Sequence, residues 1–126
     1  MKKEIKTDRA PGAIGPYSQG IEAGGLLFLS GQVPIVPQTG EVLKAGIKEQ
    51  TKLVLSNISE LLKTAGLGFK DVVKTTVFIK DMNDFAAVNE VYAQFFEAPY
   101  PARSCVEVAR LPKDVGVEIE IIAKSN

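Results

Sequence analysis

Two segments with helical periodicity alternate with segments of strand periodicity, and this order limits the fold more than any other feature of the chain. The first helical segment runs from about residue 45 to residue 65 and ends before a glycine; its apolar positions are Ile47, Val54, Ile58, Leu61, Leu62 and Ala65. The second begins at a cap residue, Asn83 or Asp84; its apolar stripe is Phe85, Val88, Tyr92 and Phe95.

The segments around these helices have the composition of strands. In residues 71–80 apolar and polar residues alternate, and many are β-branched, which predicts a strand. Residues 18–33 predict a hairpin that turns at Gly24 and Gly25. The stretches "PYPARSCVEVARL" and "VGVEIEIIAK" predict two further strands, which a turn joins as a hairpin with Arg103 across from Glu118. Residues 2–7 predict a short edge strand. Strands that flank helices in this order predict an α+β fold, with a mixed six-stranded sheet and two helices on one face.

Two helices cover only one side of such a sheet. Depending on the orientation of the strands, the other side carries residues such as Leu27, Leu29, Val106 and Val108. An apolar face of this size usually meets another subunit, so we expect an oligomer. The alternative is that long loops cover this face.

Length and composition indicate one domain over residues 1–126, with 15 basic and 15 acidic residues. This balance gives no electrostatic reason to expect nucleic acid or membrane as a partner. No run approaches the roughly 18 apolar residues of a membrane span, no signal peptide is visible, and there is one cysteine. We therefore expect a cytoplasmic protein.

The chain contains no histidine and no glycine-rich phosphate loop. A Ser-His-Asp triad, a Cys-His pair and histidine metal sites are thereby excluded. Any catalysis must depend on carboxylates, arginine, hydroxyls, backbone groups and water.

Several segments together resemble one family. The stretches "GAIGPYSQG", "LSGQVP" and "PARSCVEVARLPKDVGVEIEIIA" are similar to those of the RidA (YjgF/UK114) family of imine deaminases. The resemblance implies a chorismate-mutase-like fold assembled as a homotrimer, with active-site clefts between subunits. It also implies hydrolysis of 2-iminopropanoate and 2-iminobutanoate to pyruvate, 2-oxobutanoate and ammonia. These imines arise from dehydratases that use pyridoxal phosphate, and the hydrolysis itself requires no cofactor.

Arg103 and Glu118 are the main candidates for the site. A guanidinium binds a carboxylate through two parallel hydrogen bonds, although an arginine alone more often makes a surface salt bridge. The resemblance makes Arg103 the ligand of the substrate carboxylate. Alternation places Glu118 and Glu120 on one strand face, which is ordinarily solvated. In the family, the position of Glu118 holds water or transfers protons.

Cys105 invites a different interpretation, as a nucleophile activated by Arg103. No histidine can serve as its base, and imine hydrolysis requires no covalent intermediate. A small buried apolar residue is the simpler reading. The resemblance assigns the role at this position to the backbone carbonyl.

The same resemblance adds four further residues to the substrate site. Ser30 and Gly31 end a strand, where a glycine allows close approach of the backbone to a ligand. Tyr17 is expected to form an aromatic wall or donate its hydroxyl, and Asn89 is expected near the site. Each has an ordinary structural explanation as well, as a turn, a loop anchor or a helix-surface amide.

Two other functions remain open because members of the family differ in what they do. One is an endoribonuclease or translation inhibitor. The other is a chaperone-like module that binds small carboxylates without turnover.

Overall fold

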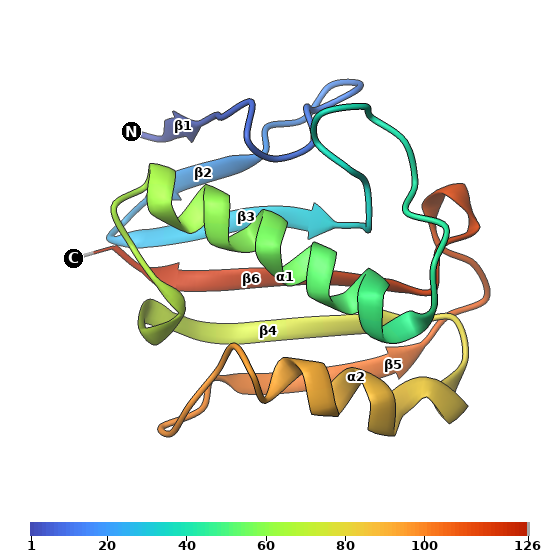
Figure 1. Cartoon of the computed structure of the whole chain (residues 1–126). Helices are drawn as coiled ribbons and strands as arrows, with labels where there is room; N and C mark the ends of the chain where they lie inside the picture. Colours follow the sequence, from blue (N-terminus) through green and yellow to red (C-terminus); the bar gives the residue numbers. More distant parts are fainter. Residues whose placement is uncertain (126) are drawn as a thin grey trace.

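A computed structural model, which describes residues 1–125, contains one mixed sheet with both helices on the same side (Figure 1). The strands lie in the order β1-β2-β3-β6-β4-β5. Their bounds are β1 Lys3–Ile5, β2 Gly20–Ala23, β3 Leu26–Gln32, β4 Val72–Ile79, β5 Ala102–Glu107 and β6 Val117–Lys124. The helices are α1 Ile47–Thr64 and α2 Phe85–Tyr92. The predicted α+β class, six strands and shared helix face are therefore confirmed.

Helix α1 forms because its apolar positions make one continuous stripe, which packs on β3 and β6 (Figure 1). The fully buried members of the stripe are Val54, Leu55, Ile58, Leu61 and Leu62. The helix ends where Gly66 adopts a φ of 75°, and the Leu67 N–H donates to the Leu62 carbonyl at 2.8 Å. This arrangement is a Schellman cap, which explains why the periodicity stops at the glycine.

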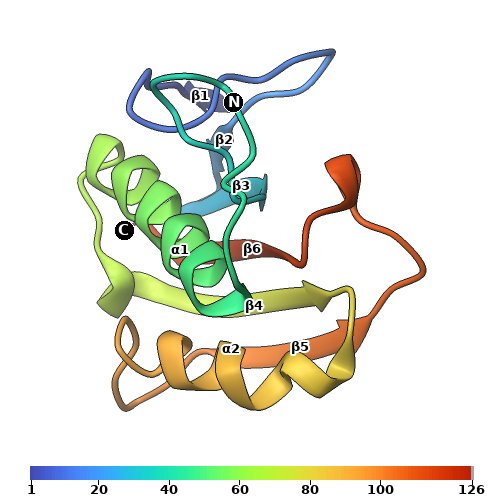
Figure 2. The same ribbon diagram turned by 45° about the vertical axis from the view of Figure 1, so that its right-hand side comes forward.

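The centre of the sheet is formed by β6, between β3 and β4. Val117, Ile119, Ile121 and Ala123 are all buried beneath the helices, whereas the alternate residues Glu118, Glu120 and Ile122 face away from them. Both β3 and β4 pair with β6 in antiparallel fashion, and β5 pairs with β4 in parallel. Figure 2 shows α2 in front of β5, as the crossover between the parallel strands requires.

The expected direct connection of the last two strands as a hairpin is wrong. Strand β5 pairs with β4 and not with β6, so β4 separates the strand of Arg103 from that of Glu118. The physical reason is burial. At the centre of the sheet, the helices cover the apolar side chains of β6, which an edge position would leave exposed. The 108–116 connection therefore crosses the end of β4.

Two details of the sheet and of α2 also differ from prediction. Leu27 and Leu29 are buried beneath the helices, and in β3 the open face instead carries Phe28, which is 42% exposed. Val106 lies on the open face as predicted and is 41% exposed. Asp84, one of the two predicted caps, occupies the position before α2, but its side chain makes no capping hydrogen bond. The preceding turn is capped by Asp81, whose carboxylate accepts from the Asn83 N–H at 2.9 Å. The helix itself ends at Tyr92, before Phe95.

Among residues 1–125, none of the helices combines the length and apolar character that a membrane crossing requires.

Candidate functional site

The predicted site residues fall into two groups within the chain. Tyr17, Ser30, Gly31 and Glu118 line one pocket, which we call the bulge pocket. Arg103, Cys105 and Asn89 lie on the other side of the sheet, at the edge covered by α2. The geometry of each group follows from the strand that carries it.

A β-bulge creates the floor of the bulge pocket. Leu29 pairs with Ile121 and Gln32 pairs with Ile119, so Ser30 and Gly31 together face the single residue Glu120. Such an extra residue bends the strand and redirects its backbone. The bulge therefore brings the backbone of Gly31 up against the side chain of Glu118.

The contact between Gly31 and Glu118 leaves no room for a side chain. A Cβ atom added at Gly31 would clash with the Glu118 Oε2 atom and lie 2.8 Å from its Cδ atom. The glycine thus allows the carboxylate to lie in this position, and a side chain here would displace it. Its φ lies outside the left-handed region, so backbone strain is not the reason.

Glu118 is half-buried, and this burial raises the pKa of its carboxyl above the ordinary value of 4.5. The neighbouring negative charge of Glu120 raises this pKa further. Both effects disfavour the ionised form. A carboxyl in this state can exchange protons closer to neutral pH than a solvated glutamate can.

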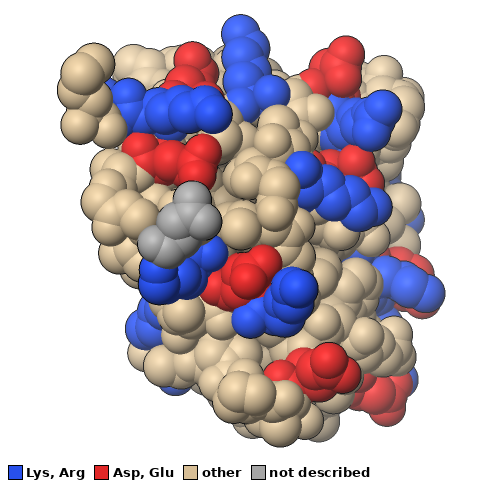
Figure 3. Space-filling view, turned by 90° about the vertical axis from the view of Figure 1, so that its left-hand side faces the viewer, with Lys and Arg blue, Asp and Glu red and all other residues tan. Residues whose placement is uncertain are grey.

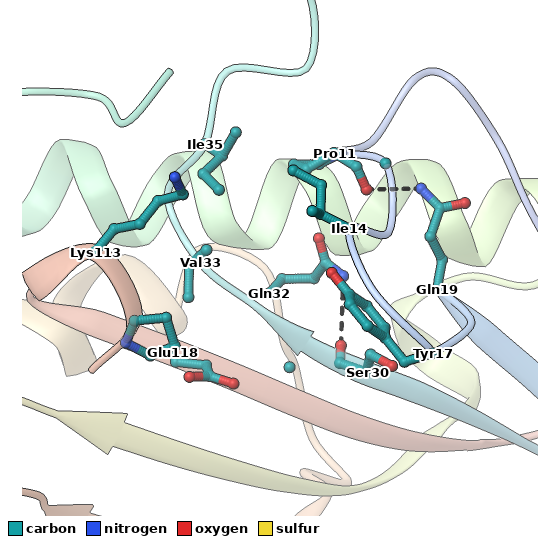
Figure 4. Close-up of a pocket in the computed structure, with 13 residues that line it drawn as sticks. Pro11, Ile14, Tyr17, Gln19, Ser30, Gln32, Val33, Ile35, Lys113 and Glu118 are labelled. Atoms are coloured by element: carbon teal, nitrogen blue, oxygen red, sulfur yellow. Dashed lines mark hydrogen bonds between the residues drawn. The ribbon is translucent and has the colours of Figure 1, made fainter. Parts of the chain in front are cut away.

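The remaining walls of the bulge pocket are largely apolar, and the cavity measures about 510 Å³. Figure 4 shows Glu118 and Lys113 on one side and Tyr17 and Gln19 on the other. Tyr17 is 53% exposed. The Ser30 hydroxyl donates to the Ser18 carbonyl at 2.6 Å, so its proton holds the 11–19 loop against the strand.

Gln19, which the sequence did not single out, fixes the loop over the pocket. Its buried amide donates to the carbonyls of Thr7 and Pro11 at 3.0 and 2.8 Å and accepts from the Thr7 N–H at 2.8 Å. Lys113 was also missed, and it lies in a turn where its φ is 56°. Both lie within stretches that resemble the family, but no local pattern predicts their contacts.

Arg103 belongs to the second group and lies against α2. Its Nη1 atom donates to Asn89 Oδ1 at 2.6 Å, and its guanidinium carbon lies 4.9 Å from the Tyr92 ring centroid and 5.5 Å from that of Phe85. The structure thus places Asn89 as a partner of Arg103. The spacing of Phe85, Asn89 and Tyr92 along one helix face was the available signal for this contact.

Cys105 lies two residues after Arg103 on the same strand face and is partly buried. Burial raises the pKa of its thiol, and the positive charge of Arg103 offsets only part of this effect. The thiol is therefore protonated at neutral pH and is a weak nucleophile.

The backbone carbonyl of Cys105 is better placed than its sulfur to contact a ligand or a water molecule. The Val108 N–H donates to the Ile79 carbonyl of β4 at 3.0 Å. By the two-residue alternation of a strand, the Cys105 carbonyl is expected to face the free edge of β5.

Arg103 and Glu118 cannot meet within one chain. Phe78 pairs with both Val106 and Glu118, so β5 and β6 are two strand spacings apart, roughly 10 Å. Arg103 lies three residues further along, and it faces the helices whereas Glu118 faces away. Each chain therefore presents these two side chains on opposite faces of its sheet.

Comparison with known proteins supports one family for this arrangement. The family model described as Endoribonuclease L-PSP matches residues 7–125. The chain belongs to the RidA (YjgF/L-PSP) family. A relative from Escherichia coli (strain K12), named 2-iminobutanoate/2-iminopropanoate deaminase, is 55% identical over 98% of each chain.

Solved structures agree with the fold. The structure of Escherichia coli TdcF with bound serine is 57% identical, covers 97% of this chain and 98% of its own, and has a TM-score of 0.92. The structure of RidA from the Antarctic bacterium Psychrobacter sp. PAMC 21119 is 43% identical, covers 97% and 98%, and has a TM-score of 0.93.

Proposed function

We propose that this protein hydrolyses the C=N bond of small 2-imino acids, of which 2-iminopropanoate and 2-iminobutanoate are the foremost candidates. The observation that carries the proposal is the half-buried Glu118 carboxyl, with its raised pKa, seated on the Gly31 bulge. The name of the 55% identical relative supplies the reaction. Enamines released by dehydratases that use pyridoxal phosphate are the expected source of the substrate.

We further propose that the working site forms between two copies in a homotrimer. Arg103 of the partner subunit would approach the bulge pocket, because one chain keeps its own Arg103 on the other face of the sheet. The exposed Phe28 and Val106 provide an apolar surface on the pocket side for such an assembly.

In the proposed mechanism, Arg103 holds the substrate carboxylate through two parallel hydrogen bonds, aided by the Gly31 N–H. The related TdcF was solved with bound serine, a small molecule that carries a carboxylate, and this likeness supports a small carboxylate as the ligand. The apolar walls, Tyr17 included, surround the remainder of the substrate. Ser30 supports the pocket through its bond to the 11–19 loop.

Glu118 and the Cys105 carbonyl orient a water molecule toward the imine carbon. The ionised Glu118 takes a proton from this water as oxygen adds to the carbon of the protonated imine, and the product of addition is a neutral carbinolamine. Glu118 returns this proton to nitrogen and then accepts the hydroxyl proton as the C–N bond breaks, so that ammonia leaves and a 2-keto acid remains. Water supplies every atom that the reaction adds, and no cofactor enters the scheme. Orientation and charge placement account for the acceleration.

A coupled assay tests the proposal. A threonine dehydratase generates 2-iminobutanoate while a nucleophilic trap competes for it, and the formation of 2-oxobutanoate is followed. We expect the protein to divert the imine from the trap in proportion to its concentration. Trapping that is unaffected by a large excess of folded protein would contradict the proposal.

An endoribonuclease is the second candidate, because the matching family model carries that description. The formal net charge is zero. On the face in Figure 3, acidic and basic side chains are interspersed, and no broad basic patch is seen there. Phosphate backbones are bound mainly through such patches. Cleavage of RNA that persists in an Arg103→Ala variant would favour this candidate.

Binding of 2-oxobutanoate without imine turnover would instead favour a carboxylate-binding module.

A further inference from the structure

The guanidinium of Arg103 is held by three side chains of α2. It lies over the rings of Tyr92 and Phe85, at 4.9 and 5.5 Å from their centroids, and bonds to Asn89 at 2.6 Å. Cations are attracted to aromatic faces within about 6 Å. An exposed arginine is ordinarily mobile, but this one makes three contacts with a single helix.

Tyr92 connects this contact to the core. Its ring stacks on Phe96, with centroids 4.3 Å apart and planes 24° apart, and its hydroxyl shares a 2.9 Å hydrogen bond with Thr75. Tyr92 is 6% exposed, and Thr75 is completely buried. Thr75 is also the residue that pairs with Arg103 between β4 and β5. The ring beneath the guanidinium is therefore fixed from below and from the side.

We propose that Tyr92 is a positioning residue for carboxylate recognition, acting through Arg103. Ordering a free arginine side chain costs conformational entropy. A ring that holds the guanidinium before the ligand arrives removes part of this cost from binding. This inference rests on one part of the proposed function, which is the binding of the substrate carboxylate by Arg103.

Three variants separate this role from general packing. Tyr92→Leu removes the ring, and Tyr92→Phe keeps it while deleting the hydroxyl. Phe69→Leu is the matched control, because Phe69 contacts the same cluster through Phe95 and Phe96, at 5.5 and 5.0 Å, and makes neither of the Arg103 ring contacts. All three are expected to lower the melting temperature.

Steady-state kinetics and binding of 2-oxobutanoate by calorimetry provide the first measurement. For Tyr92→Leu we expect KM and the Kd of the keto acid to rise about fivefold, with kcat within twofold. Tyr92→Phe and Phe69→Leu should stay within twofold in all three quantities. A purely structural residue would lower the active fraction, and therefore the apparent kcat, without raising KM.

The second measurement follows the guanidinium directly. The chain has three arginines, Arg9, Arg103 and Arg110, so NMR of protein with isotope-labelled arginine gives few side-chain signals, and Arg103→Lys assigns one of them. Ring currents should place the Arg103 Nε–H signal upfield in the wild type, in Tyr92→Phe and in Phe69→Leu. The signal should return toward the free-arginine position in Tyr92→Leu.

Failure of this inference can be told apart from failure of the proposed function. Wild-type protein that binds 2-oxobutanoate but hydrolyses no imine removes the proposed function, and the Tyr92 role is then decided by Kd and NMR. If the wild type is active, and Tyr92→Leu leaves both KM and the Arg103 signal unchanged, only the Tyr92 role is overturned. An equal rise of KM in Phe69→Leu also overturns it, and wild type that neither binds nor hydrolyses overturns both.

Discussion

Arg103 and Glu118 lie on opposite faces of the same sheet, with β4 between their strands. A substrate of three or four carbons cannot touch both residues of one chain. A site that uses both must therefore be shared by two copies, and each prediction below tests one part of such a site.

Removing the guanidinium should weaken substrate binding. We expect Arg103→Ala to lower kcat/KM about 100-fold, mainly through KM, because a charged hydrogen-bond partner of the carboxylate is lost. Arg103→Lys should be intermediate, since one ammonium cannot make two parallel bonds. Arg110→Ala, at another exposed arginine, is the control and should remain within twofold. Unchanged kinetics in Arg103→Ala, with the assembly intact, would exclude Arg103 from the site.

Glu118 should determine the acid limb of the pH profile. Its carboxyl must be ionised to accept a proton from water, so kcat/KM should fall as the pH falls through a pKa that burial holds above 4.5. Glu118→Gln should lower kcat by at least about 100-fold, and any residual activity should lack this limb. Glu120→Gln removes the second cause of the raised pKa and should shift the limb to lower pH. A limb that persists in Glu118→Gln would assign it to another group.

Stability should respond to the same group with a definite sign. The folded protein holds the Glu118 proton more tightly than the unfolded chain does, because the folded pKa is raised. The stabilisation from this group is complete below the unfolded pKa and is lost as the pH rises through the folded pKa. Differential scanning fluorimetry should therefore show that the melting temperature of Glu118→Gln, relative to that of wild type, rises from pH 4 to pH 7. A relative melting temperature that falls over this range would contradict the raised pKa.

Gly31→Ala should damage catalysis more than folding. The new methyl group would meet the Glu118 carboxylate, which can swing away because it is the end of a flexible side chain. We expect kcat to fall by about 10- to 100-fold through misplacement of the carboxylate, with a small change in melting temperature. Gly12→Ala is the control on the same pocket, since an added Cβ there has nothing within 4 Å. Equal activity in both variants would show that the position of Glu118 is unimportant.

Cys105→Ala should retain activity within about threefold, because the thiol is protonated at neutral pH and its carbonyl remains in place. The measurement is kcat/KM beside a melting curve, together with the rate at which a disulfide reagent modifies the wild-type thiol, which should be slow. Complete inactivity of a folded Cys105→Ala protein would restore the covalent mechanism.

Local patterns were sufficient to predict most of the elements. The stripe of α1 and its glycine stop were visible because they depend on neighbours within two helical turns. The alternation after Val117 correctly placed Glu118 and Glu120 on one strand face, which the structure shows to be the face away from the helices. Strand order was less accessible, since pairing of β5 with β4 depends on which strand is best buried at the centre.

The sequence was sufficient to nominate candidate site residues but not to predict how they are arranged in the chain. The family motif pointed to Arg103, Glu118 and Gly31, yet the expected hairpin would have joined Arg103 to Glu118 within one chain. The contacts of Gln19 and Tyr92 extend over 12 and 17 residues of sequence, and no local rule identifies such partners. The Asn89 contact with Arg103 likewise requires α2 to cross over β5.

Mixed oligomers test the shared site most directly. Arg103→Ala and Glu118→Gln proteins are unfolded together in equal amounts, refolded and assayed beside each variant refolded alone. If each site takes Arg103 from one copy and Glu118 from its neighbour, random mixing makes about a quarter of the sites intact, and a comparable fraction of wild-type activity should return. Activity in the mixture that equals the mean of the two inactive variants, with mixed oligomers shown by mass spectrometry, would contradict the shared site.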